Sequence, residues 1–202
     1  ARAGVRNETL RLPSSRWRAQ NETVQAMHLS ALETWWMRSL TAYLDTLPAP
    51  PVLYEGVAGD VLSSGLYKDE HLRRLYDRGE FATIAEALLG EEKYFERLLS
   101  ADYYRRFRRE LAVEQLSTEL AKHAGAPNQL GSFFLYNRTR RVTALAPTTL
   151  LSPRATVWCP YLDADVWEFL SSLPPEFLEG DDATALHDEA MHRAYPKYAD
   201  IP

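Results

Sequence analysis

The chain has 202 residues and a formal net charge of −5, with 46% hydrophobic and 25% charged residues. This balance is typical of a globular protein and excludes a disordered or collagen-like chain, while the acidic charge argues against a dedicated nucleic-acid-binding protein. Cys159 is the only cysteine, which excludes an internal disulfide and a cysteine-based zinc cluster. No apolar run approaches the roughly 20 residues of a membrane span. We therefore predict a soluble, cytoplasmic protein without membrane or nucleic-acid partners.

The first half of the chain begins with a polar, arginine-rich arm over residues 1–20. From Glu22 to Leu47, apolar residues recur every three or four positions, which predicts one long amphipathic helix that Pro48 ends. The apolar triplet Val52–Tyr54 then predicts a buried strand. The glycine-containing segment 57–65 follows it and predicts a tight turn that opens a helix.

The rest of the chain has a helical pattern. We predict helices over 70–78, 82–89, 129–144, 164–173 and 183–194, with Asn128 and Asp163 as N-caps. Residues 91–123 are predicted to form one long helix, or two with a break near Ser100. A second short segment, Thr156–Trp158, is too short to form a sheet alone. The strand at Val52 is therefore predicted to pair with strands outside these residues. The chain also starts without Met and ends abruptly at Pro202, so we expect it to be part of a longer protein.

The most informative segment for chemistry is the turn after the first predicted strand, Glu55-Gly-Val-Ala-Gly-Asp60. Glycines let backbone amides approach an anion closely, and the amides at a helix start favour phosphate. A carboxylate at this place repels phosphate unless a divalent cation lies between them, which makes Asp60 a candidate Mg²⁺ ligand. The alternative is that Asp60 only complements the helix dipole.

A second segment, Arg154–Glu176, combines an apolar strand, the sequence Pro-Tyr-Leu-Asp, a short helix and the sequence Ser-Leu-Pro-Pro-Glu. It resembles a signature of the C-terminal ATP-pyrophosphatase domain of the asparagine synthetase family. The turn at Gly56–Asp60 is similar to the Gly-x-Gly-x-Asp turn of that family, the Trp35-Trp36 pair to the helix before it, and Asn137–Arg141 to its arginine-bearing helix. These motifs occur in the family's order over most of the chain.

The resemblance implies a mainly α chain: the C-terminal portion, over residues 21–202, of an α/β ATP-pyrophosphatase (adenine nucleotide α-hydrolase-like) domain with one or two orphan strands. It also implies an ATP- and Mg²⁺-dependent, amide-forming ligase of the glutamine-hydrolysing asparagine synthase type, which adenylates a small-molecule carboxylate. On this basis Gly56, Ala58 and Gly59 line the nucleotide pocket, and Asp60 holds Mg²⁺. Arg138 or Arg141 either faces the phosphates or pairs with local acids.

The departures from the family are also informative. The pyrophosphate loop Ser-Gly-Gly-x-Asp-Ser is absent from these residues, as is the glutaminase cysteine, for which Cys159 is no replacement. Val57 stands where relatives often carry an acid, and no lysine occurs near Thr184. We therefore expect the chain alone to be inactive without the N-terminal half of the domain. An amide or macrolactam synthetase with another substrate, a non-catalytic scaffold module and a homo-oligomer remain alternatives.

Other candidate residues have simpler interpretations. We interpret His28 as a core residue, His187 as a solvated or helix-stabilising residue, and the pair Ser63-Ser64 as small residues that let the turn pack. The remaining histidines have no zinc-like spacing: His71, His123 and His192. The run Arg105–Arg109 is predicted to be a solvated helix face with ion pairs rather than a nucleic-acid patch.

Overall fold

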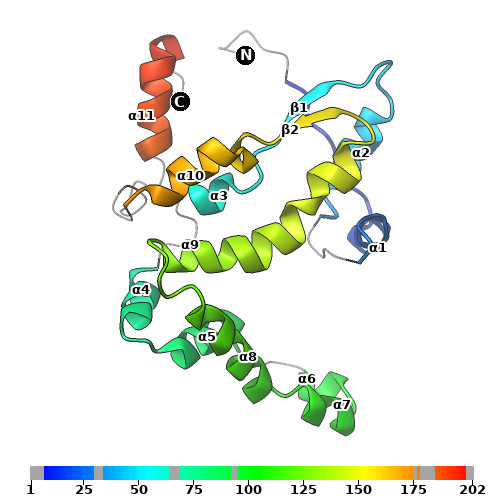
Figure 1. Ribbon diagram of the computed structural model, residues 1–202. Helices are drawn as coiled ribbons and strands as arrows, with labels where there is room; N and C mark the ends of the chain where they lie inside the picture. Colours follow the sequence, from blue (N-terminus) through cyan, green and yellow to red (C-terminus); the bar gives the residue numbers. More distant parts are fainter. Residues whose placement is uncertain are drawn as a thin grey trace. The chain divides into compact units, whose positions relative to one another are not determined.

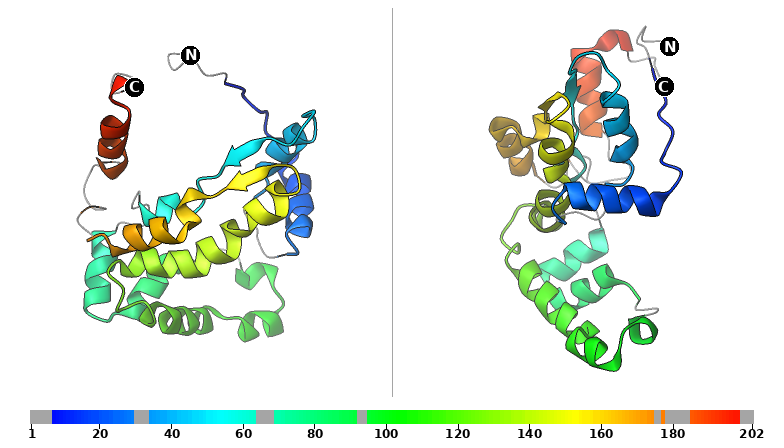
Figure 2. Two further views of the ribbon diagram at one scale, coloured as in Figure 1. Left: turned by 45° about the horizontal axis from the view of Figure 1, so that its top comes forward. Right: turned by 90° about the vertical axis from the view of Figure 1, so that its right-hand side faces the viewer.

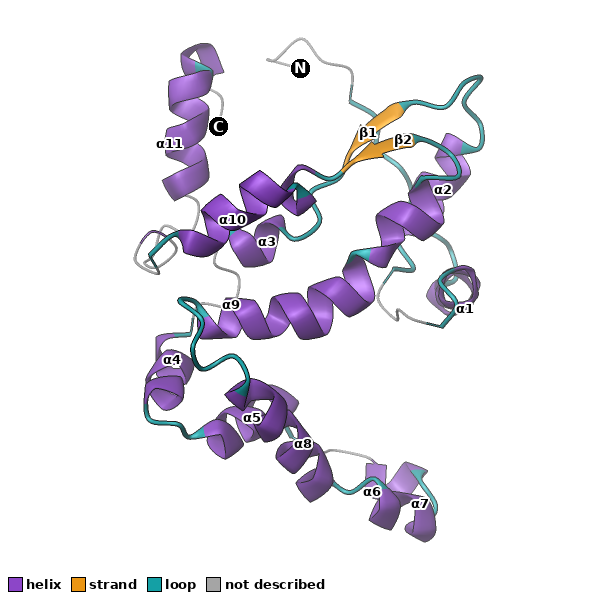
Figure 3. Cartoon of the chain, viewed as in Figure 1, coloured by secondary structure: helices purple, strands orange, loops and turns teal. Residues whose placement is uncertain are grey.

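The computed structural model describes residues 7–29, 34–63, 69–91, 95–174, 177 and 185–198. The described chain is mainly helical with a small parallel sheet (Figure 3). It divides into two compact units, the first formed by residues 1–66 and 134–202 and the second by residues 67–133. The segment 21–202, expected to form part of one domain, is thus distributed over both units.

The first unit holds both strands and contains α1 (Arg16–Ala26), α2 (Met37–Leu44), β1 (Val52–Tyr54), α3 (Gly59–Leu62), η1 (Leu135–Thr143), η2 (Pro147–Leu151), β2 (Thr156–Trp158), η3 (Pro160–Leu162), α10 (Ala164–Ser172), α11 (Ala185–Ala194) and η5 (Pro196–Tyr198). The segments η1 and η2 are wide, π-helical turns, in which Ala144 N–H bonds to the Thr139 carbonyl and Ser152 N–H to the Pro147 carbonyl. Such turns are rare and occur frequently at functional sites.

The single long helix predicted over residues 22–47 is wrong. The helix α1 starts earlier, at Arg16, because the Ser15 side chain accepts a hydrogen bond from a first-turn amide. It ends before His28 and Leu29, whose φ angles of 52° and 62° are left-handed and cannot continue a right-handed helix. His28 is exposed rather than part of the core, so this interpretation is also wrong.

The two short strands pair with each other, which corrects the prediction that β1 finds its partners outside the chain. They run parallel, with Val52 opposite Thr156 and Tyr54 opposite Trp158, and lie side by side in Figure 2. Their central residues, Leu53 and Val157, pack against the core, while the residues at both ends are exposed. A sheet of two three-residue strands is stable here because one of its faces packs against helices.

The core of the first unit lies beneath this sheet. Its buried members come from the end of α1, from α2 and from the segment around η2: Met27, Met37, Leu44, Ala146, Leu150 and Leu151. Residues 152–155 separate η2 from β2, and the central residues of both strands, Leu53 and Val157, pack against this cluster. The core therefore joins the helices of this unit to the sheet.

The second unit is helical, and most of its elements match the predictions. It contains α4 (Glu70–Asp77), α5 (Phe81–Leu89), α6 (Phe95–Leu98), α7 (Ala101–Arg106), α8 (Arg109–Ala121) and α9 (Gln129–Phe134). The last residue of α9, Phe134, already belongs to the first unit. The prediction of one helix or two over residues 91–123 is wrong, because the described part of this range forms α6, α7 and α8, with the expected break near Ser100 and a second break at Phe107 and Arg108. The predicted cap at Asn128 is confirmed, since its side chain accepts a hydrogen bond from Gly131 N–H at 2.8 Å. Among the described residues, no helix is both long and apolar enough to cross a membrane.

Candidate functional site

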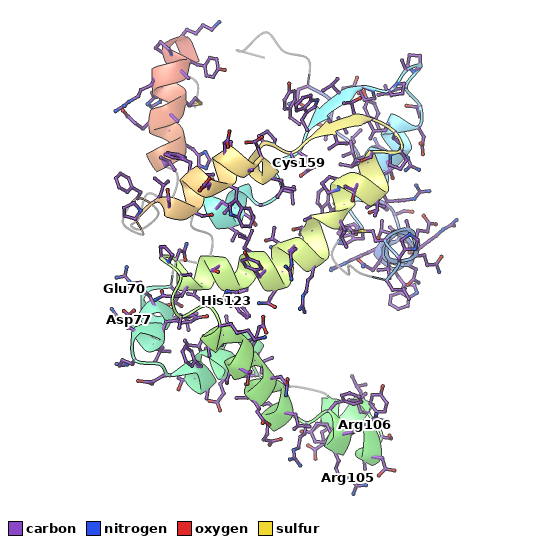
Figure 4. All side chains as sticks on the ribbon, viewed as in Figure 1. Glu70, Asp77, Arg105, Arg106, His123 and Cys159 are labelled. Carbon is purple, nitrogen blue, oxygen red and sulfur yellow. The ribbon has the colours of Figure 1, made fainter. Side chains whose placement is uncertain are left out.

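The candidate site lies where the chain leaves the two strands. Because β1 and β2 are parallel, their carboxyl ends meet at one edge, and the pairing continues as Glu55 N–H donates to the Trp158 carbonyl at 2.8 Å. The turn to α3 follows β1, while Cys159 and η3 follow β2 (Figure 4), and α3 contacts α10 (Figure 1). In open parallel sheets, ligands bind outside the carboxyl ends of the strands.

A cavity of about 220 Å³ opens at this edge. The turn after β1 lines it through Glu55, Gly56, Val57, Ala58 and Asp60. The opposite lining comes from η1 and the start of η2, including Arg138, and from residues at the start of α2. The predicted turn and the predicted arginine helix, which lie about eighty residues apart in the chain, therefore meet at one cavity.

Asp60 and Arg138 place opposite charges on this cavity. One carboxylate oxygen of Asp60 accepts a hydrogen bond from Val61 N–H at 2.9 Å, and the other lies 3.7 Å from Nη1 of Arg138. The Asp60 side chain is 43% exposed, so solvent or a ligand can reach it. Arg138 therefore pairs with a local acid, and that acid is the candidate metal ligand. Arg141 is exposed on the same turn and is not among the residues that line the cavity.

The three small residues predicted to line a nucleotide pocket have different surroundings. Gly56 and Ala58 line the cavity, and Ala58 has a left-handed φ of 73°. Gly59 is not among the lining residues. Its missing side chain instead makes room for Tyr161, because a Cβ at Gly59 would lie 2.7 Å from a ring carbon of that tyrosine.

Glu55 is a cavity residue that the motif analysis missed. Burial raises the pKa of its carboxyl, although Gly56 N–H, which donates to it, lowers the pKa. Burial also raises the pKa of the Cys159 thiol, and the nearby Glu55 charge raises it further. A raised pKa favours the thiol of Cys159 over its thiolate, which is the nucleophilic form.

Glu55→Gln should raise the melting temperature at pH 7. The folded carboxyl has a pKa above its ordinary value of 4.5, so as pH rises past that value the unfolded chain releases this proton first and folding loses stability. A glutamine removes this loss of stability, and the increase in melting temperature over wild type should shrink towards pH 4. Thermal unfolding at both pH values measures the effect, with exposed Glu168→Gln as control. A lower melting temperature at pH 7 would contradict this assignment.

The residues at the cavity are compatible with Mg²⁺ only if a phosphate completes its coordination. Among the described residues, no group of three or more histidine, cysteine, aspartate or glutamate side chains could hold a metal. Protein Mg²⁺ sites often use just one or two carboxylates together with waters and substrate phosphates, and Asp60 and Glu55 are the two acidic residues among those that line this cavity. The neighbouring guanidinium of Arg138 suits the phosphate.

Ser63 and His187 form a contact that no sequence pattern indicated. Ser63 Oγ lies 2.7 Å from Nε2 of His187, and the imidazole ring meets the Tyr161 ring edge to face. His187 is therefore partly buried in contact with another element, which the interpretation of it as a solvated or helix-stabilising residue did not include. The two residues are 124 positions apart, so only the fold brings them together. Ser64 and Thr184 lie outside the described residues.

The remaining candidates are parts of the second unit. His123 Nδ1 lies 2.9 Å from Ser132 Oγ, and burial lowers the pKa of its imidazole, which is typical of a packed structural histidine. Arg105 and Arg106 are labelled in Figure 4; Arg105 pairs with Asp102, and Cζ of Arg106 lies 5.6 Å from the centroid of the Phe107 ring, a cation–π contact. The ion pair is exposed as expected, but the run Arg105–Arg109 is not one helix face, because α7 ends at Arg106 and α8 begins at Arg109.

Comparison with protein-family models, with curated proteins and with solved structures finds no match for this chain. The functional interpretation therefore depends on the geometry at the strand ends and on the motifs that meet there.

Proposed function

We propose that this chain provides the pyrophosphate-binding side of an ATP-dependent, amide-forming ligase of the asparagine synthetase type. In such a reaction a carboxylate oxygen attacks the α-phosphorus of ATP and pyrophosphate leaves. An amine nitrogen then attacks the acyl carbon of the adenylate, loses a proton, and AMP leaves as the amide forms. The observation that carries the proposal is the meeting of Asp60 and Arg138 at one cavity beside the carboxyl ends of two parallel strands.

The charges and size of the cavity support a diphosphate group as its ligand. A carboxylate suits the cation and a guanidinium suits the phosphate, so the Asp60–Arg138 pair matches a magnesium–phosphate ion pair. The volume of about 220 Å³ is below the roughly 300–1,000 Å³ of cavities for drug-sized ligands, which favours pyrophosphate over a whole nucleotide.

Each residue has a defined role in this proposal. Asp60 holds the cation through its exposed carboxylate, and Arg138 binds the phosphate oxygens. Gly56 and Ala58 let the backbone of the turn come close to the ligand. When bound, a magnesium ion neutralises the charge of the departing pyrophosphate and orients it.

Asp60→Asn should weaken the binding of magnesium pyrophosphate by about tenfold or more, because it removes the negative charge that holds the cation. Isothermal titration calorimetry of the full chain with pyrophosphate measures this, with and without Mg²⁺. The matched control is Asp165→Asn, which changes an exposed carboxylate in the first turn of α10 and should leave the affinity unchanged.

Two results would contradict the proposal: no Mg²⁺-dependent heat with the wild-type chain, or equal affinity in wild type and Asp60→Asn. The first result favours a non-catalytic scaffold module. A parallel incubation with ATP, Mg²⁺ and aspartate should release no AMP, because the loop Ser-Gly-Gly-x-Asp-Ser is not among these 202 residues. Binding without turnover is the pattern expected for this chain.

A further inference from the structure

A cluster of three side chains supports the helix that carries Asp60. Ser63 ends α3, Tyr161 belongs to η3 and His187 to α11, so three distant parts of the first unit contribute to it. None of the three is among the residues that line the cavity. Their contacts all lead to α3, which has only four residues. A helix this short cannot form by itself and depends on its tertiary contacts.

The hydrogen bonds of Ser63 define the direction of this support. Ser63 is only 1% exposed, and its Oγ lies 2.9 Å from the Gly59 carbonyl oxygen and 2.7 Å from Nε2 of His187. A hydroxyl has one proton to donate. When Ser63 Oγ–H donates to the Gly59 carbonyl, the Nε2–H of His187 donates to Oγ, and both bonds are satisfied. His187 thereby holds the serine that closes the single turn of α3.

Tyr161 links the same two elements by packing. Its ring occupies the space beside Gly59 where a side chain would otherwise lie, and its centroid is 6.2 Å from that of the His187 ring in an edge-to-face arrangement. The start of α3 is thus held through Gly59 and its end through Ser63. Asp60 lies between these two points.

We propose that His187 is a positioning residue of the candidate site: through Ser63 and Tyr161 it holds α3 in place and so keeps the Asp60 carboxylate at the cavity. This inference depends on the proposed function for the ligand, magnesium pyrophosphate. It also means that α11, which is otherwise largely exposed, couples to the site through one imidazole ring.

His187→Ala should speed hydrogen exchange of the Leu62 and Ser63 amides, which close the turn of α3, by about two- to tenfold, since one hydrogen bond to a buried group is lost. It should weaken magnesium pyrophosphate binding by a similar factor. His187→Gln places an N–H near the Nε2 position and should therefore bring both the amide exchange rate and the affinity most of the way back to their wild-type values. His192→Ala removes an exposed histidine from the same helix and should change neither.

A double-mutant cycle with Ser63→Ala tests the path of the effect, because the two substitutions should be non-additive if His187 acts through Ser63. Unchanged amide exchange in His187→Ala overturns the inference, as does faster exchange with unchanged affinity for magnesium pyrophosphate. If the wild-type chain binds no magnesium pyrophosphate while the exchange responds as expected, His187 still positions α3, and the proposed function is the part that fails.

Discussion

Leu151→Ala should lower the free energy of unfolding of the chain by about 2–5 kcal/mol. Leu151 is fully buried at the end of η2, in the cluster that joins α1 and α2 to the sheet. The substitution removes apolar contacts and leaves a cavity that neighbours such as Leu44 fill only in part. Because domains are stable by only about 5–15 kcal/mol, this loss is a large share of the total. Urea denaturation followed by circular dichroism measures it.

The matched control for this substitution is Leu162→Ala. Leu162 belongs to η3 of the same unit but is 40% exposed, so its truncation should cost much less. Equal losses for the two variants would contradict the placement of the core beneath the strands. The comparison also bears on the site, because Leu151 precedes β2, whose carboxyl end borders the cavity.

The elements that local chemistry determines were predicted well. Asp163 was expected to cap a helix and accepts hydrogen bonds from Asp165 and Val166 N–H at the start of α10. The helix predicted at 70–78 is α4, with the Asp69 side chain as its N-cap. Caps and turn residues act within three or four positions, so their effects are visible in the sequence alone.

Elements that depend on distant contacts were not predictable in the same way. The apolar repeat over 22–47 continues across the break at His28 and Leu29, because both α1 and α2 bury residues in one core and so keep a compatible pattern. The pairing of β1 with β2 joins segments about one hundred residues apart. A triplet of apolar residues carries no information about its partner.

The residues of the candidate site likewise fall into those that the sequence predicts and those that only the fold identifies. Residue types and spacing single out Asp60 and the turn before it, and the motif comparison leaves Arg138 and Arg141 as two candidate arginines. Glu55 and His187 acquire their surroundings only in the fold, Glu55 through partial burial near Cys159 and His187 through contact with Ser63. A half-buried carboxylate and a positioning histidine are properties of packing rather than of a motif.

Gly59→Ala should displace Tyr161 and weaken magnesium pyrophosphate binding, with a stability loss of about 1–3 kcal/mol. The new Cβ would lie 2.7 Å from one ring carbon and 3.0 Å from two others, closer than side-chain atoms pack. The ring must therefore move away from α3. Because the same ring contacts His187, both supports of the Asp60 helix change together.

Gly125→Ala is the matched control, since a Cβ at Gly125 meets no atom within 4 Å and Gly125 is not among the residues that line the cavity. It should leave the fold and the affinity nearly unchanged in calorimetry and thermal unfolding. Combining Gly59→Ala with Tyr161→Ala removes the clashing ring and should recover part of the lost stability, whereas affinity should stay low because the contact to His187 is gone. Full recovery of affinity in this double variant would mean that the ring only fills space and that Asp60 is positioned without it.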